Sequence, residues 1–125
     1  MLKILFVEDD KDLNLITTSY LKDCGFDVVS VYNGLDALNK YEEESFDLIL
    51  SDIMMPLCDG FKLASIIRES NQQIPIIFMS ARDDKPSKQL GYKAGIDDYI
   101  TKPFDLDELV LKINAIARRM NINNS

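Results

Sequence analysis

The sequence predicts a doubly wound parallel α/β domain, and three observations support that fold class. Short apolar runs alternate with amphipathic stretches five times along the chain. The first, third and fourth runs are almost continuously apolar, as strands are when helices cover both faces of a sheet. Glycine and proline residues stand at the joins between segments. A chain of 125 residues corresponds to one domain with an ordinary hydrophobic core.

The five apolar runs are expected to form the strands, and the stretches between them change to a helical period of apolar residues. The expected strands are residues 4–7, 28–31, 48–50, 76–79 and 99–100. The helical faces expected to pack on the sheet are Leu13, Ile16, Tyr20, Leu21 and Cys24; Leu35, Leu38 and Tyr41; Phe61, Ala64 and Ile67; and Leu106, Leu109, Val110, Ile113, Ile116 and Met120.

The weakest of the expected helices covers residues 86–94. Gly91 stands in its middle, where glycine costs roughly 0.5–1 kcal/mol relative to alanine, and few apolar positions hold the segment down. The polar residues 121–125 are interpreted as a tail or the start of a linker, which places the domain at residues 1–120.

Composition and charge exclude several kinds of chemistry. The chain has no histidine, so it cannot carry a Ser-His-Asp triad, a histidine-bound metal or a phosphohistidine of its own. Its two cysteines, Cys24 and Cys58, form no CxxC pair, which argues against a thiolate zinc site. The net charge of −7 would be repelled by nucleic acid and by anionic membranes. No apolar stretch reaches the length of a membrane span, and free cysteines fit a cytoplasmic protein.

Polar residues follow four of the expected strands, where ligands bind in open α/β sheets. Glu8 and Asp9 follow the first strand, Asp52 the third, Ser80 the fourth and Lys102 the fifth. Carboxylates gathered at one rim repel one another, and Mg²⁺ would relieve that repulsion because it prefers carboxylates, water and phosphate oxygens. The lysine would then supply positive charge to a bound phosphoryl group.

Rival phosphate sites fit the sequence less well than a shared metal and phosphoryl site. The sequence has neither GxxxxGK[ST] nor a GxGxxG after the first strand. A flavin-phosphate loop would need free amides at the place where this chain has acids, although a flavodoxin-like electron carrier stays open as an alternative that a flavin spectrum would reveal. A single acid after a strand is usually a helix cap, and Asp10 is interpreted in that way.

The residues in this order and spacing resemble the receiver domain of bacterial two-component response regulators over essentially the whole chain. The resemblance implies a sheet of five parallel strands in the order 2-1-3-4-5 with five helices. The motifs that carry it are Glu8-Asp9, Asp52 with Pro56 and Asp59-Gly60, Ser80-Ala81, Asp97-Asp98-Tyr99 and Lys102-Pro103-Phe104.

The resemblance assigns the phosphoryl acceptor and the metal ligands. Asp52 would accept a phosphoryl group from the phosphohistidine of a sensor histidine kinase. Asp9, Asp52 and the backbone carbonyl of Met54 would bind Mg²⁺, with Glu8 assisting through water, and Mn²⁺ would be a substitute. The chain would catalyse only its own phosphorylation and dephosphorylation, and so would not be a conventional enzyme.

The resemblance also assigns the residues that respond to phosphorylation. Lys102 would pair with the phosphoryl oxygens, and it is expected to gain this partner only when the phosphoryl group arrives. Ser80 would donate a hydrogen bond to the same group, and Tyr99 would swing inward as Ser80 moves. The Lys102–Pro103 peptide bond would be cis.

The segment from residue 95 to 104 resembles receivers attached to winged-helix transcription factors of the OmpR/PhoB type. Such receivers dimerise on activation through their fourth helix, fifth strand and fifth helix. DNA would then be contacted only through a carboxyl-terminal effector domain that these 125 residues do not include. The alternative is a stand-alone receiver that docks on a partner protein. The implied pairs across the dimer are Lys88 with Glu108, Asp98 with Lys112, and Asp97 with Arg119.

Overall fold

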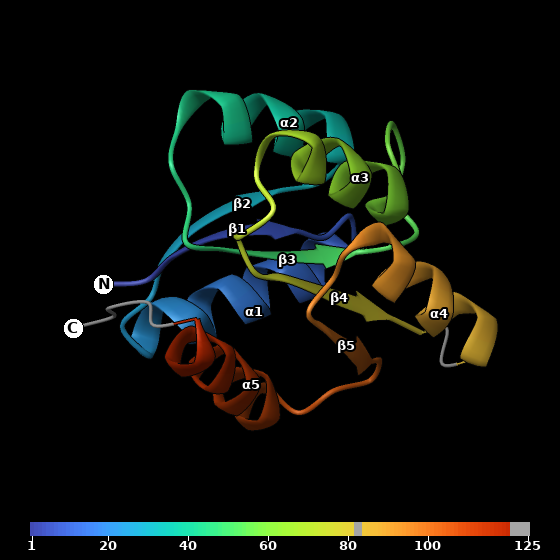
Figure 1. Ribbon diagram of the computed structural model, residues 1–125. Helices are drawn as coiled ribbons and strands as arrows, with labels where there is room; N and C mark the ends of the chain where they lie inside the picture. Colours follow the sequence, from blue (N-terminus) through green and yellow to red (C-terminus); the bar gives the residue numbers. More distant parts are fainter. Residues whose placement is uncertain (82–83, 121–125) are drawn as a thin grey trace.

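The computed structural model describes residues 1–81 and 84–120 of the chain. They form one parallel sheet between two layers of helices (Figure 1). Residues 121–125, which the sequence predicts to be a tail or linker, lie outside the described residues. Within the described ranges, no helix combines the length and the apolar character that crossing a membrane requires.

The sheet has the strand order β2-β1-β3-β4-β5, with every neighbouring pair parallel, so the predicted fold class and strand order are confirmed. The register aligns the strands so that their carboxyl ends meet along one edge: Val7 lies opposite Ser51, and Ser80 lies opposite Thr101. The strands are β1 (Lys3–Val7), β2 (Asp27–Val31), β3 (Leu48–Asp52), β4 (Ile76–Ser80) and β5 (Asp98–Thr101).

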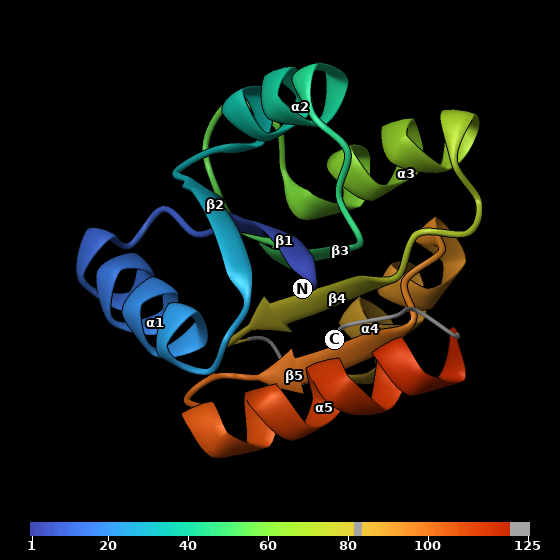
Figure 2. The same ribbon diagram turned by 90° about the vertical axis from the view of Figure 1, so that its left-hand side faces the viewer.

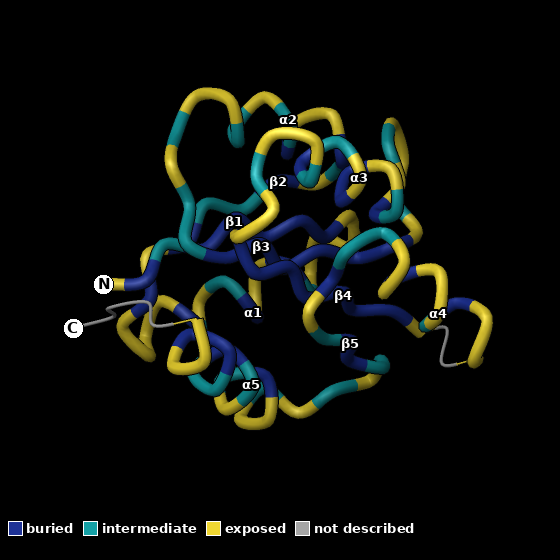
Figure 3. The backbone as a smooth tube through the Cα atoms, in the orientation of Figure 1, coloured by how far each residue is buried: buried dark blue, intermediate teal, exposed yellow. Residues whose placement is uncertain are grey.

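Five helices cover the two faces of the sheet. Helices α1 and α5 pack on one face, and α2, α3 and α4 pack on the other (Figures 1 and 2). The three inner strands, β1, β3 and β4, are almost fully buried, which explains why their sequences are nearly continuous in apolar residues, whereas the edge strands β2 and β5 are partly exposed (Figure 3). The helices are α1 (Lys11–Asp23), α2 (Gly34–Glu43), α3 (Gly60–Ser70), α4 (Lys85–Ala94) and α5 (Leu106–Arg119).

The buried face of α1 differs from the predicted one. Asn14, Thr17 and Leu21 are buried, whereas Ile16 is 58 % exposed and Cys24 is exposed. The apolar period was misleading here, because the helix turns a polar side chain, Asn14, towards backbone carbonyls at the strand ends. Leu35 and Met120, which were also assigned to packing faces, are 47 % and 37 % exposed.

Helix α4 buries little apolar surface, as its composition predicted. It begins at Lys85, one residue before the predicted start, and its buried residues are Ser87 and Gly91. Asp84 caps it by accepting a hydrogen bond from the Ser87 amide, and Gly95 ends it in the left-handed conformation. Since a helix with two small buried residues removes little apolar surface from water, it is well suited to a segment that moves.

Candidate functional site

The carboxyl-terminal edge of the sheet brings together the predicted polar residues. Asp52 ends β3 and Ser80 ends β4, while Glu8 and Lys102 directly follow β1 and β5. Glu8 and Ser80 are 0 % and 2 % exposed, and Asp52 is 6 % exposed. Polar groups buried this deeply need partners, so their contacts define the chemistry of the site.

Lys102 bridges the two buried carboxylates. Its ammonium group donates to Glu8 Oε1 at 2.6 Å and to Asp52 Oδ2 at 2.9 Å. The other Asp52 oxygen accepts a hydrogen bond from the Ile53 amide at 2.7 Å. The expectation that Lys102 gains its partner only when a phosphoryl group arrives is therefore wrong: two acids already compete for one lysine, and the lysine is positioned before any phosphoryl group binds.

Burial and charge shift the proton affinities of this cluster. Burial raises the pKa of Glu8 to about 7, against the opposing effect of the hydrogen bond from Lys102. Burial alone would lower the pKa of Lys102, but hydrogen bonds to Asp52 and Glu8 outweigh it, so the pKa is raised. The lysine is thus held as a cation, while Glu8 is an acid whose negative charge is poorly compensated.

A third carboxylate completes an acidic cluster. One oxygen each from Glu8, Asp9 and Asp52 lie within 4.8 Å of one another, and Asp9 is exposed to solvent. Asp10 instead caps α1 by accepting from the amides of Asp12 and Leu13, as the sequence predicted. Three carboxylates converge here with only one bridging lysine, so the cluster carries excess negative charge. Carboxylates are the ligands that a hard divalent cation prefers.

The loop after β3 is held against the site by a close backbone approach. The Gly60 amide donates to the Ile53 carbonyl at 2.8 Å. A Cβ atom at Gly60 would lie 2.6 Å from the Asp52 carbonyl oxygen and 2.9 Å from Ile53 Cα. The first residue of α3 must therefore be glycine if the helix is to begin this close to Asp52. Met54, whose carbonyl was assigned to the metal, lies in this loop with its side chain 58 % exposed.

We predict that Gly60→Ala destabilises the fold by about 1–3 kcal/mol, because the new methyl group overlaps backbone atoms that cannot move aside cheaply. Urea unfolding measures this effect. Ser65→Ala, on the exposed side of the same helix, is the matched control and should change stability by no more than about 0.5 kcal/mol. Equal stabilities for the two variants would show that α3 can shift without cost.

The other predicted response residues lie on β4 and β5. Ser80 is buried at the end of β4, and its carbonyl accepts from the Lys102 amide at 2.7 Å. The Lys102–Pro103 peptide bond is cis, as expected. Tyr99 is 8 % exposed, so its ring already lies inward in this structure, and Lys88 Nζ lies 5.7 Å from the ring centroid. Any movement of Tyr99 on activation would therefore start from this inward position.

Asn14 is a site residue that sequence reasoning missed. Its side-chain amide donates to the carbonyls of Glu8 and Val31 at 3.1 and 3.2 Å. It thereby ties α1 to the ends of β1 and β2 and fixes the backbone that carries Glu8. A polar residue between the apolar positions of α1 was the available signal, but apolar periodicity gives such a residue no weight.

An apolar hollow of about 320 Å³ lies beside the cluster. Lys102 forms its wall together with Leu13, Ala81, Pro103 and Phe104. The ammonium group of Lys102 contacts two acids, and the same residue lines the apolar hollow. Lys102 therefore lies between the acidic cluster and the hollow. A molecule approaching the cluster from that side would contact apolar groups first.

The residues assigned to a dimer face form contacts within the chain. Lys112 donates to Asp98 at 3.3 Å, and Arg68 pairs with Asp97 at 3.2 Å. Glu108 and Arg119 are exposed on α5. Two of the three implied intermolecular pairs therefore contain a carboxylate that already has a partner in its own chain. The pairing across a dimer stays a prediction.

The sequence matches the family model described as the response regulator receiver domain over residues 4–114. It is 41 % identical over 119 residues to the transcriptional regulatory protein RprY of Bacteroides fragilis, covering 95 % of this chain and 50 % of that protein. The chain thus spans about half the length of the curated relatives that it matches.

Solved structures share the fold closely. The Francisella response regulator 1452 receiver domain superposes with a TM-score of 0.90 at 36 % identity, covering 95 % of this chain and 98 % of that one. The receiver domain of the sensor histidine kinase PA1611 from Pseudomonas aeruginosa has a TM-score of 0.83 at 29 % identity, with 96 % and 98 % coverage. That structure holds a magnesium ion in its active-site cleft.

Proposed function

Because the chain belongs to the family of response regulator receiver domains, we propose that it is activated when Asp52 accepts a phosphoryl group from a sensor histidine kinase. The observation that carries the proposal is the buried Asp52 carboxylate, paired with Lys102 beside two further acids. Because the chain belongs to this family, a flavodoxin-like electron carrier is no longer an alternative function.

The proposed reaction moves one phosphoryl group between two molecules. The nitrogen–phosphorus bond of the donor's phosphohistidine breaks, and a new bond joins phosphorus to an oxygen of the Asp52 carboxylate. The donor histidine must lie outside these 125 residues, because they contain none. Phosphoryl transfer has a loose transition state, so catalysis rests on positioning and charge neutralisation, both of which Lys102 supplies from its place against Asp52 Oδ2.

The donor set fits a divalent cation. Asp9, Asp52 and the Met54 carbonyl would hold Mg²⁺, with Glu8 acting through water, and Mn²⁺ would substitute. The convergence of three carboxylate oxygens within 4.8 Å supports this fit. When bound, the cation supplies positive charge to the phosphoryl oxygens. The chain's own contribution is to orient Asp52 through the Ile53 amide and Lys102.

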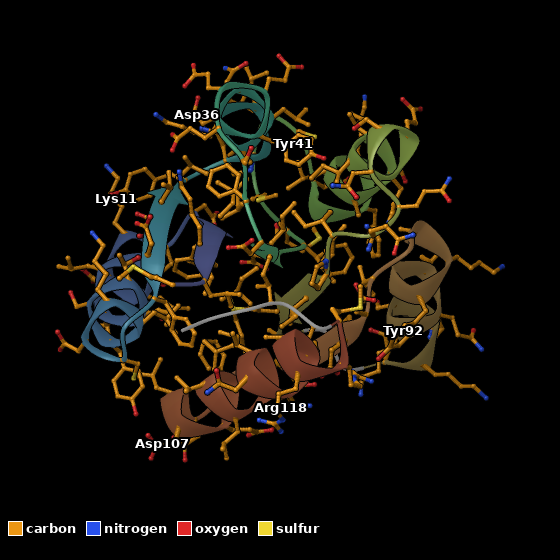
Figure 4. The ribbon with its side chains drawn as sticks, turned by 60° about the vertical axis from the view of Figure 1, so that its left-hand side comes forward. Lys11, Asp36, Tyr41, Tyr92, Asp107 and Arg118 are labelled. Atoms are coloured by element: carbon orange, nitrogen blue, oxygen red, sulfur yellow. The ribbon has the colours of Figure 1, made fainter. Side chains whose placement is uncertain are left out.

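The proposed output is a change in the face formed by α4, β5 and α5. Ser80 lies at the active-site edge, Tyr99 lies on β5, and α4 buries only two small residues. A phosphoryl group gripped by Ser80 and Lys102 would favour one arrangement of this face over the other. Glu108 and Arg119, which were assigned to this face, are exposed on α5. Asp107, labelled with Arg118 in Figure 4, instead accepts a hydrogen bond from Tyr20 of α1.

In the activated state this face would pair with a second copy, and a carboxyl-terminal effector domain would bind DNA. The curated relatives are named as transcriptional regulators, which supports this output. A stand-alone receiver that docks on a partner is the second candidate, favoured by the contact that Asp98 already makes with Lys112 in its own chain. We assign the protein to the cytoplasm, where a sensor kinase would reach it. We propose that residues 1–120 form the receiver domain.

Incubation with acetyl phosphate and Mg²⁺ tests the proposed function. We expect intact-mass spectrometry to show one added phosphoryl group, and chelation of the metal with EDTA to prevent the addition. A chain that stays unmodified at saturating acetyl phosphate and Mg²⁺, while its fold is intact, would contradict the assignment of a phosphoryl acceptor.

A further inference from the structure

Arg68, near the end of α3, joins three separate segments. Its Nε and Nη2 donate to the Gly95 carbonyl at 2.9 and 2.8 Å, and its Nη1 donates to the carbonyls of Asn71 and Ile74 at 3.1 and 2.7 Å. Its Nη2 also pairs with Asp97 Oδ2 at 3.2 Å. The guanidinium group therefore holds the end of α3, the segment just before β4 and the turn between α4 and β5.

The turn after α4 is shaped to receive this side chain. Gly95 has a φ of +102°, and a Cβ atom there would lie 3.0 Å from both Cγ and Nε of Arg68. The Arg68 side chain is 16 % exposed, so its contacts are largely shielded from water. A largely shielded guanidinium with a partner for each of its nitrogens is costly to displace, so the turn is held firmly.

Asp97 is oriented by the same contacts. Its Oδ2 accepts both from Arg68 and from the Ile76 amide, the latter at 2.8 Å. Its own amide donates to the Ile76 carbonyl at 2.8 Å. The side chain nevertheless remains 32 % exposed. A carboxylate has about four acceptor positions, so two inward bonds leave capacity on its other oxygen for a cation outside.

We propose that Arg68 is a positioning residue for the face formed by α4, β5 and α5. Arg68 holds Asp97 in the one orientation that accepts Arg119 of a second copy. The inference rests on the proposed function, since the dimer is part of it. An exposed ion pair contributes little because two mobile side chains must be ordered to form it. Fixing Asp97 beforehand removes part of that entropic cost, so the pair between copies is stronger than that between two free side chains.

The experiment measures the dimer dissociation constant by sedimentation with Mg²⁺ and beryllofluoride, a phosphoryl mimic. Arg68→Gln should weaken the activated dimer about threefold to tenfold, because a two-fold dimer contains two such pairs. Lys22→Gln removes the same charge from the exposed end of α1 and should leave the constant unchanged. Equal dimerisation of Arg68→Gln and the unaltered chain would overturn the proposal.

A double-mutant cycle separates positioning from general damage. In an Asp97→Asn background, the further change Arg68→Gln should weaken the dimer less than about twofold, since its effect passes through the lost carboxylate. A full effect in both backgrounds would show that Arg68 acts by another route. If Arg68→Gln does not fold, Arg68→Lys replaces it, because lysine keeps the charge and stem but lacks the fork of donors.

Two further readouts distinguish failure of this inference from failure of the proposed function. Arg68 contacts the segment just before β4, whereas Asp52 ends β3, so the two lie at opposite ends of the parallel strands. Acetyl phosphate should therefore label Arg68→Gln as fast as the unaltered chain. Hydrogen exchange at the Ile76 amide should be faster in Arg68→Gln. If the chain never dimerises, although hydrogen exchange at the Ile76 amide is faster in Arg68→Gln, the proposed dimer is rejected. If the chain dimerises equally well with and without Arg68, the positioning role is rejected.

Discussion

Asp52→Asn should take up no phosphoryl group from acetyl phosphate, whereas the unaltered chain takes up one. An amide cannot form the acyl phosphate, because its nitrogen is not an acceptor and its oxygen is a poor nucleophile. The fold should survive, since the asparagine oxygen can still accept from the Ile53 amide and the Glu8–Lys102 pair remains. Intact-mass spectrometry after incubation with Mg²⁺ and acetyl phosphate measures the result.

Two controls sharpen this result. Asp23→Asn removes an acid from the exposed end of α1 and should be labelled at the normal rate. Asp9→Asn keeps the acceptor but loses a ligand charge, so it should bind Mg²⁺ more weakly by calorimetry and be labelled more slowly. Labelling of Asp52→Asn to the same extent as the unaltered chain would place the acceptor elsewhere.

The active-site rim could be predicted because it follows from topology. Once the apolar runs are assigned to a parallel sheet, the residues after them must meet at one edge, and this brings Glu8, Asp52 and Lys102 together whatever the details of packing. The state of Lys102 could not be predicted in the same way. Whether a lysine is free or paired depends on burial and on distances of a few tenths of an ångström, which the sequence pattern does not contain.

The contacts that sequence reasoning missed share one property. Asn14 and Arg68 are polar residues on helices, and each bonds to a backbone carbonyl on a distant segment, Asn14 to Val31 and Arg68 to Gly95. Arg68 and Asp97 are 29 residues apart and lie on different segments. Apolar periodicity identifies which face of a helix is buried, but it is silent on the polar side chains that fasten one segment to another.

Lys102→Ala should lower stability as well as prevent switching, in contrast to a lysine that acts only on the phosphorylated state. Its removal leaves Glu8 and Asp52 buried side by side without their cation. Breaking a fully buried pair costs about 3–5 kcal/mol; protonation of Glu8 limits the cost here, so we expect about 2–3 kcal/mol at neutral pH. That corresponds to a fall in Tm of roughly 10 °C for a domain of this size.

The cause of this loss can be separated from a simple packing defect. If uncompensated charge is responsible, then Glu8→Gln combined with Lys102→Ala should recover part of the stability, and Mg²⁺ should raise Tm more in Lys102→Ala than in the unaltered chain. Lys40→Ala is the control, because its pairs with Glu43 and Glu44 are partly exposed. It should cost roughly 0–1 kcal/mol and so lower Tm by no more than about 4 °C. A Lys102→Ala protein that melts with the unaltered chain and still dimerises with beryllofluoride would show that the bridge between Glu8 and Asp52 contributes neither to folding nor to switching.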